Sequence, residues 1–400
     1  MREKKFLARL NKDERLLIIF SAFHGIAQVF LGTFVVSFLI RNSINEILSV
    51  SLYDLFFYLA IMLSFVLMVD RCKRGNLKIV FASHIIVQII LILLIALLGT
   101  NAANWVMVLG ILYGGQHALY TMSTQQMTID KVSAKRMSFF YGSNIAMVSI
   151  VKILIPITLG ALITVGSLQN IAWVMTVMGL IEFCLLFMLS PSKHHETKKA
   201  DFTGFMRRSI QLPCVRELFT AEFVRGFAYE LETVGVLYIV YVFHTDMNLG
   251  AWTTFFAIVT AVAAWLFGRF CSKRDFMWCT GACSILLIGS IICLMFGVNG
   301  FSTVAYAGAL ALSIQMMDQI LSVNVLNLAK TKFITKAYRA EYLASRQLVS
   351  FVGRWGGIIA LLYVGVFGGY AILPYLLVLF ALARIFAAFM YVKIGKYTNG

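Results

Sequence analysis

The chain has 400 residues, of which 60% are hydrophobic and only 13% are charged. Because soluble domains carry about 25% charged residues, this composition excludes an ordinary soluble protein and indicates an integral membrane protein. The net charge of +16 would suit nucleic-acid binding, but its distribution along the chain favours membrane topology instead.

Apolar runs recur along the chain, each long enough to cross a hydrocarbon core of roughly 30 Å as an α-helix. They are too continuously apolar for the alternating strands of a membrane barrel. The basic N-terminal segment precedes the first run with no small-residue cleavage site, so we interpret that run as a retained helix. The twelve predicted helices span residues 16–40, 47–69, 79–99, 104–128, 138–165, 168–190, 215–243, 250–270, 276–297, 302–328, 342–367 and 371–392.

Lysine and arginine residues gather on one side of the predicted helices. With the N-terminus in the cytoplasm, 28 of the 34 lie in the terminal segments and the even-numbered loops. The opposite side carries only Arg41, and the remaining five (34 − 28 − 1) lie within helices. The positive-inside rule therefore predicts a multi-pass protein of the cell membrane with both termini in the cytoplasm. We interpret the basic loops chiefly as topology signals that contact anionic lipid, and expect a monomer with no nucleic-acid partner.

The seven cysteines contain no Cys-x-x-Cys pair, which favours neither a disulfide framework nor a metal site. No nucleotide-binding loop of the Gly-x4-Gly-Lys-Ser/Thr type is present in the sequence, so nothing indicates ATP as an energy source. We therefore predict no metal site and no cofactor.

The two halves of the chain resemble each other at an offset of about 200 residues. The basic segment 191–213 separates six helices from six, which predicts bundles at 1–190 and 214–400 joined by a cytoplasmic loop. Transporters commonly contain such repeats, with the substrate site near the membrane midplane where the repeats meet. The matches, at offsets from 200 to 203, pair Cys72-Lys73-Arg74 with Ser272-Lys273-Arg274, His24-Gly25-Ile26-Ala27 with Arg225-Gly226-Phe227-Ala228, Lys152 with Arg354, and Arg136 with Arg339.

An all-α integral membrane protein of two pseudo-symmetric six-helix bundles resembles the major facilitator superfamily over essentially the whole chain. The family's loop signature Gly-x-x-x-Asp-Arg-x-Gly-Arg-Arg follows the second helix in degenerate form, with Val66 for the first glycine and the second glycine late, at Gly75. The resemblance implies a cytoplasmic gate, and the alternative is a topology signal alone. The gate residues would be Asp70, Arg71, Lys73 and Arg74 in the first copy and Arg269 in the second.

The fifth helix partly matches a second family signature, the glycine-rich helix of antiporters. Gly142, Pro156 and Gly160 match this signature, whereas Val151, Ile155 and Leu159 replace expected glycines. Pro156 is expected to kink the helix. The partial match favours export.

The resemblance assigns the first, fourth, seventh and tenth helices to a central cavity. Each carries polar residues at helical spacing, such as His24 and Gln28 at i and i+4. For any single glutamine or histidine, the alternative is an interhelical hydrogen bond worth about 1 kcal/mol. The predicted substrate-binding residues are His24, Gln28, Gln116, Tyr120, Lys152, Arg225, Tyr229, Gln315 and Arg354.

The seventh helix carries two glutamates near its middle. At about 100° per residue, Arg225, Tyr229 and Glu232 share one face of a straight helix, whereas Glu230 faces away. Glu230 then needs a partner on another helix, such as Arg354 or Asp318, or a proton. We predict proton coupling through Glu230, Glu232 and Asp318, with Glu232 favoured, and the alternative is a set of permanent salt bridges.

Other membrane charges receive simpler interpretations. Glu182 and Arg384 belong to the sixth and twelfth helices, which lie outside the cavity in the family's fold, and Arg384 is expected to reach the membrane surface. His84 and Gln88 on the third helix are expected to bond to neighbouring helices.

The predicted function is secondary active transport by alternating access, coupled to protons, with export of an amphipathic or anionic small molecule. The alternatives are uptake of an anionic nutrient and lipid or glycolipid flipping, the latter because Glu222-Phe223-x-Arg225-Gly226 resembles a short flippase motif. A membrane-embedded enzyme is disfavoured because His-Glu-x-x-His, Gly-x-Ser-x-Gly and paired-aspartate motifs are absent from the sequence. A receptor that has lost transport remains a third class.

Overall fold

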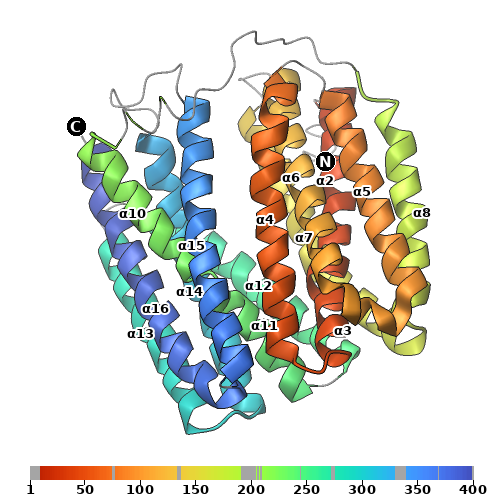
Figure 1. Ribbon diagram of the computed structural model, residues 1–400. Helices are drawn as coiled ribbons and strands as arrows, with labels where there is room; N and C mark the ends of the chain where they lie inside the picture. The colour runs from red at the N-terminus through yellow and green to blue at the C-terminus, as the bar shows by residue number, and fades with distance from the viewer. Residues whose placement is uncertain are drawn as a thin grey trace. The chain divides into compact units, whose positions relative to one another are not determined.

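The computed structural model describes residues 10–73, 77–132, 137–190, 204, 207, 210–243, 245–271, 275–328, 339–367 and 369–398. Every regular element within these ranges is a helix, as predicted (Figure 1). The chain divides into two compact units. Unit 1 comprises the described residues of Met1–Ser43, Leu52–Lys199 and Thr245–Thr254, and unit 2 those of Ile44–Ser51, Ala200–His244 and Phe255–Gly400. The predicted bundle boundaries at 190 and 214 stay a prediction.

Unit 1 contains the first six predicted spans. Its elements are α2 (Lys12–Val29), the π-helical η1 (Phe30–Val35), α3 (Val36–Arg41), α4 (Glu46–Lys73, its first turns in unit 2), α5 (Leu77–Leu98), the 3-10 helix η2 (Gly99–Trp105), α6 (Val106–Lys131), α7 (Met137–Val165) and α8 (Leu168–Leu186).

Unit 2 contains the other six predicted spans. Its elements are α10 (Pro213–Phe227), α11 (Glu230–Phe243), α12 (Asp246–Phe270, its first turns in unit 1), α13 (Phe276–Phe296), α14 (Gly300–Leu328), α15 (Arg339–Phe367), α16 (Gly369–Ile394) and the 3-10 helix η4 (Gly395–Thr398).

By length and composition, ten segments of the described chain could cross a membrane. One of them, Leu77–Thr128, has 52 residues and includes both the third and the fourth predicted spans, joined through η2. The eighth predicted span corresponds to α12, which is not among the ten. All twelve predicted spans therefore have helical counterparts in the described residues, with ends shifted by a few residues.

The first and seventh predicted spans are not the continuous α-helices that the sequence suggested. In the first, π-helical η1 separates α2 from α3, and at its Gly32 a Cβ would lie only 3.0 Å from the Tyr113 hydroxyl. A π-turn of this kind often marks a functional site. The segment places Tyr113 against the first helix.

The seventh span is broken between α10 and α11. The Tyr229 amide donates to the Gly226 carbonyl at 3.0 Å, and the Glu232 amide donates to Tyr229 at 3.1 Å. These i to i−3 hydrogen bonds tighten the turn relative to an α-helix. The expectation of one continuous seventh helix is therefore wrong at Ala228 and Tyr229, between the end of α10 at Phe227 and the start of α11 at Glu230. The fifth span, by contrast, continues through Pro156 as the single helix α7.

Corresponding helices pack together in the two units. In unit 1, α2 packs on α7, and a Cβ at Gly25 would lie 3.1 Å from Val151 Cγ1. In unit 2, α10 packs on α15, and a Cβ at Gly226 would lie within 2.5 Å of the Ser350 carbonyl oxygen. Small residues let membrane helices approach this closely. Gly25 and Gly226, which the internal repeat pairs, both lie at these contacts.

The close approach in unit 2 depends on a Gly-x-x-x-Gly pair on α15. A Cβ at Gly353 would overlap the Phe223 carbonyl, and one at Gly357 would overlap that of Phe227. Glycine at both positions therefore brings the two backbones into contact. The consequence is that polar side chains of α15 reach the break between α10 and α11.

Candidate functional site

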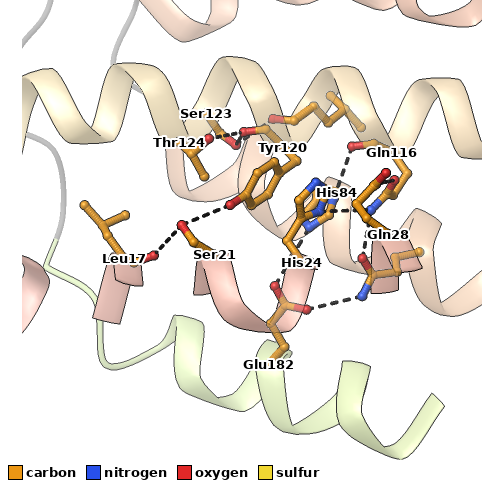
Figure 2. Close-up of polar contacts among 12 residues, drawn as sticks. Leu17, Ser21, His24, Gln28, His84, Gln116, Tyr120, Ser123, Thr124 and Glu182 are labelled. Atoms are coloured by element: carbon orange, nitrogen blue, oxygen red, sulfur yellow. Dashed lines mark hydrogen bonds and ion pairs between the residues drawn. The ribbon is translucent and has the colours of Figure 1, made fainter. Parts of the chain in front are cut away.

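A polar network of histidines and amides crosses unit 1, linking α2, α5, α6 and α8 (Figure 2). At its centre Gln116 is fully buried, and its Nε2 donates to Gln88 Oε1 at 2.8 Å. Its Oε1 accepts from Gln28 Nε2 at 3.5 Å, and its Nε2 also lies 3.4 Å from His24 Nδ1. Tyr113 donates to Gln28 Oε1 at 2.6 Å. Three polar side chains thus meet at Gln116, and Tyr113 extends the network through Gln28.

His24 is packed between aromatic rings. The Tyr120 ring stacks on it with a centroid distance of 3.4 Å and an interplanar angle of 10°. Tyr120 also donates to Ser21 Oγ at 3.1 Å. Because the amide nitrogen of Gln116 can only donate, it fixes His24 Nδ1 as an unprotonated acceptor. The structure therefore brings His24, Gln28, Gln116 and Tyr120 together in a buried network, and their role in substrate binding stays a prediction.

The other end of this network includes residues that we expected to be peripheral. Glu182 is completely buried, accepts a hydrogen bond from Gln88 Nε2 at 3.3 Å, and lies beside His84. His84 Nδ1 contacts the Gln116 carbonyl oxygen at 3.2 Å. The prediction that His84 and Gln88 bond to neighbouring helices is confirmed. The peripheral interpretation of Glu182 is wrong, because α8 turns this carboxylate towards α5.

Lys152, the remaining predicted binding residue of this unit, has an exposed side chain on α7. It is not part of the buried network, and its role in substrate binding stays a prediction. Gln315 on α14 is partly buried, and its predicted role is likewise untested.

Unit 2 carries an ionic cluster at the contact of α10 with α15. Glu222 is fully buried between two arginines, with Arg225 Nη2 at 3.0 Å and Arg346 Nε at 3.4 Å. A buried carboxylate requires such partners, because an isolated ion in a low-dielectric interior is strongly unfavourable. Arg225 also donates to Ser350 Oγ at 3.5 Å. Neither Glu222 nor Arg346 is among the predicted site residues.

The cluster continues to α14 and α16 through Asp318. Its Oδ1 lies 2.5 Å from Arg384 Nη2 and 3.7 Å from Arg225 Nη1. Only 4% of the Arg384 side chain is exposed. The expectation that Arg384 reaches the membrane surface is therefore wrong. Its guanidinium instead turns inward, because Asp318 on α14 compensates its charge.

Arg354 lies over the break between α10 and α11. Its guanidinium carbon is 3.7 Å from the centroid of the Tyr229 ring, a cation–π contact that the close packing of α15 makes possible. Glu232 is partly buried and interacts electrostatically with Asp318 and with Arg384, Arg354 and Arg225. Arg225, Tyr229, Glu232, Asp318 and Arg354 are thus brought together, and their roles in substrate binding and proton coupling stay predictions.

Glu230 lies beside α15 and is not exposed. It is fully buried. A Cβ added to Gly357 of α15 would lie 3.2 Å from Glu230 Cγ. Its side chain therefore packs against α15, one turn from Arg354. This agrees with the expectation that Glu230 faces a neighbouring helix, and its predicted role in proton coupling is untested.

Most of the predicted gate lies outside the described residues. Arg74 is not described, and neither are the side chains of Asp70, Lys73 and Arg269. Arg71 is exposed, with Nη1 3.8 Å from Met68 Sδ. The gating role stays a prediction. Within the described part of the chain, no group of three or more His, Cys, Asp or Glu residues could hold a metal ion.

Comparison with known proteins identifies one family. The family model of the Major Facilitator Superfamily matches residues 16–358. No curated protein matches the sequence.

Several solved structures share the fold at low sequence identity. The nucleoside transporter NupG has a TM-score of 0.72 at 12% identity, covering 95% of this chain and 99% of that chain. A bacterial homologue of the iron transporter ferroportin, in an inward-facing state, has a TM-score of 0.71 at 13% identity, covering 96% and 98%. A bacterial metal transporter has a TM-score of 0.62 at 14% identity, covering 96% and 99%. At these identities the likeness concerns the fold alone.

Proposed function

Because the chain belongs to the major facilitator superfamily of membrane transporters, we propose that it couples proton movement to the export of an amphipathic or anionic small molecule. Transport proceeds by alternating access, as a secondary active process. The observation that carries this proposal is the cluster in unit 2, where Glu232 and Asp318 lie among Arg225, Arg354 and Arg384. Intramembrane charges of both signs are the groups that transporters use for anions and protons.

The arginines suit a carboxylate or phosphate group of the substrate. The Tyr229 ring covers one face of the Arg354 guanidinium, so the N–H donors of that group point outward in its plane. A planar guanidinium in this position can donate two parallel hydrogen bonds to a carboxylate or phosphate. The aromatic ring beside it offers an apolar surface, which favours an amphipathic anion.

Glu232 is the carboxylate best suited to carry the proton. It is partly buried, and both an acid, Asp318, and three arginines act on its charge. Binding an anionic substrate to one of these arginines would weaken that arginine's support of the ionised Glu232. Substrate and proton are thereby linked through shared partners. Glu230, packed against α15, is assigned a structural role instead.

The test is flux of p-aminohippurate, an amphipathic carboxylate, in proteoliposomes with and without a pH gradient. We expect Glu232→Gln to lose gradient-driven flux at least tenfold, because the amide cannot exchange a proton. Glu230→Gln should keep gradient-driven flux, measured per amount of folded protein. Glu217→Gln serves as the matched control, because Glu217 pairs with Lys393 at 2.7 Å at the far end of α10. Full gradient-driven flux in both Glu232→Gln and Glu230→Gln would refute proton coupling through α11.

The same preparation separates the alternatives. An enzyme or a receptor of this fold should show no flux that an ionophore abolishes, and the sign of the productive gradient distinguishes export from nutrient uptake. Loading the liposomes with a fluorescent lipid tests the flippase reading suggested by Glu222-Phe223-x-Arg225-Gly226. In the structure Glu222 and Arg225 of that motif pair with each other, which favours the small-molecule reading.

A further inference from the structure

A second pair of ionisable groups lies in unit 1, outside the proposed transport cluster. His84 on α5 and Glu182 on α8 are both completely buried. Nε2 of His84 and Oε1 of Glu182 lie 3.9 Å apart (Figure 2). Among the described residues, neither of these two atoms has a hydrogen bond. Two fully buried polar atoms thus face each other without a direct bond.

The hydrogen-bonding capacity of the neighbouring groups determines which atoms of this pair can carry a proton. His84 Nδ1 contacts the carbonyl oxygen of Gln116 at 3.2 Å, and a carbonyl can only accept. Nδ1 therefore carries a proton. In a neutral imidazole Nε2 is then a bare lone pair, and the atom it faces belongs to a carboxyl group. If that group were ionised, two acceptors would face each other in a fully buried site, which is strongly unfavourable.

We propose that His84 and Glu182 form a proton-binding site of unit 1 that holds one proton in total, either on Nε2 or on Oε1. With one proton the pair is neutral overall, whether the proton lies on the ring or on the carboxyl group. With none it carries a buried negative charge, and with two a buried positive charge. Both of these states are costly to desolvate.

A chain of hydrogen bonds leads from this site to Gln28. Tyr113 donates to Gln28, Gln28 to Gln116, Gln116 to Gln88, and Gln88 to Glu182 Oε2. Every bond in this series points towards the carboxyl group. Each amide has one donating and one accepting end, so the orientation of one fixes the orientation of the next. Oε2 of Glu182 accepts from Gln88 whether or not Oε1 carries the proton, so the chain keeps this orientation and connects the site to Gln28 at its partly buried end.

The surroundings of the pair contain no other charged side chain that the structure describes nearby. From α2 comes His24, whose ring is 5.4 Å from that of His84, and from α6 come His117 and Tyr120. Nδ1 of His24 is held unprotonated by Gln116. On α7, which also packs on α8, the one described cation, Lys152, is exposed. The proton balance at the site is thus decided by His84 and Glu182 themselves.

Only the link to transport rests on the proposed function. If transport is proton-coupled, this site supplies a second proton-binding position, and it reaches Gln28 through the amide chain. The proton count at His84 and Glu182 does not depend on any substrate. The two parts of the inference can therefore be tested separately.

The proton count can be read by nuclear magnetic resonance on the full chain in lipid nanodiscs. The ¹⁵N shift of His84 Nε2 and the ¹³C shift of the Glu182 carboxyl are measured at neutral pH. His84→Gln and Glu182→Gln assign the two signals, and Thr176→Val is the matched control because Thr176 on α8 bonds only to its own helix at Ala172. We expect one proton in total, on the ring or on the carboxyl group. A neutral ring beside an ionised carboxylate, or a charged ring beside a protonated carboxyl, would overturn the proposal.

The link to coupling uses Glu182→Gln, because the amide can donate to His84 Nε2 and accept from Gln88 and so imitates the protonated pair. We expect gradient-driven p-aminohippurate flux to fall at least tenfold while exchange of the same anion without a gradient persists. Unchanged gradient-driven flux in this variant would overturn the link while leaving the proton count standing. If the wild type itself shows no dependence on the gradient, the proposed function fails, and the link fails with it.

Discussion

Ser21, His24 and Gly25 occupy positions of α2 that correspond, at an offset of 201, to Glu222, Arg225 and Gly226 of α10. In unit 1 the first two belong to a neutral network of hydroxyl, imidazole and amide groups. In unit 2 their counterparts form an ion pair at 3.0 Å. The glycine is common to both, and so is the helix packing it allows. One scaffold thus supports a hydrogen-bonded site in one repeat and an ionic site in the other.

The two kinds of site differ in the free-energy cost of burying them in the membrane. A neutral network loses little when it leaves water, provided its donors and acceptors are matched. An ionic cluster must compensate each charge, so it depends on every partner at once. We therefore expect unit 2 to be the more sensitive half to a single substitution, and unit 1 the more tolerant.

The strongest test compares Glu222→Gln with Ser21→Ala at corresponding positions. Glu222→Gln leaves Arg225 and Arg346 without the carboxylate between them, and breaking such a buried pair costs about 3 to 5 kcal/mol. Ser21→Ala loses the acceptor of one hydrogen bond from Tyr120, worth about 1 kcal/mol. Unfolding free energies from denaturant titration in mixed micelles measure both.

A charge-conserving substitution at Glu222 serves as the control for this comparison. Glu222→Asp keeps the charge and should recover part of the loss. Equal costs for Glu222→Gln and Ser21→Ala would mean that the ionic cluster is hydrated in the membrane, and the distinction between the two units would disappear.

The shared glycines give a test of intermediate size. In Gly226→Ala the new Cβ would overlap the Ser350 carbonyl, which is backbone, so α10 and α15 must separate. Overpacking of this kind costs about 1 to 3 kcal/mol. In Gly25→Ala the nearest atom is Val151 Cγ1 at 3.1 Å, the end of a side chain that can rotate.

Gly25→Ala should therefore be neutral or slightly stabilising, because alanine favours a helix over glycine by about 1 kcal/mol. Thermal melting in the same detergent compares the two variants directly. A loss in Gly25→Ala as large as in Gly226→Ala would show that the two helix pairs are packed equally tightly, contrary to the structure.

The sequence predicted all twelve spans and several of the residues that gather in each unit, because apolar length and helical spacing depend only on the local sequence. His24 and Gln28 illustrate this, since a spacing of four places them on one face of any helix. The inward turn of Glu182 and Arg384 was missed, because it depends on which helix packs alongside. The break between α10 and α11 was also missed, because no proline marks it and the one local signal, Gly226, was interpreted as part of the internal repeat.

The smallest expected effect concerns the cations of the repeat, Arg354 and Lys152, which correspond at an offset of 202. Arg354→Lys keeps the charge but loses the planar group that lies 3.7 Å from the Tyr229 ring centroid. The cost should be about 0.5 to 1 kcal/mol, because an ammonium group stacks less well on an aromatic ring.

Lys152→Arg is the matched exchange in unit 1, where the side chain is exposed, and its stability should not change measurably. Unfolding free energies of both variants, with Tyr229→Leu as a third, decide the matter. If the ring contact stabilises unit 2, Arg354→Lys should cost much less in the Tyr229→Leu background than in the wild type, because the partner of the cation has already been removed. An equal cost in both backgrounds would assign the effect of Arg354 to its ionic neighbours alone, and the aromatic contact would then contribute nothing to the difference between the two units.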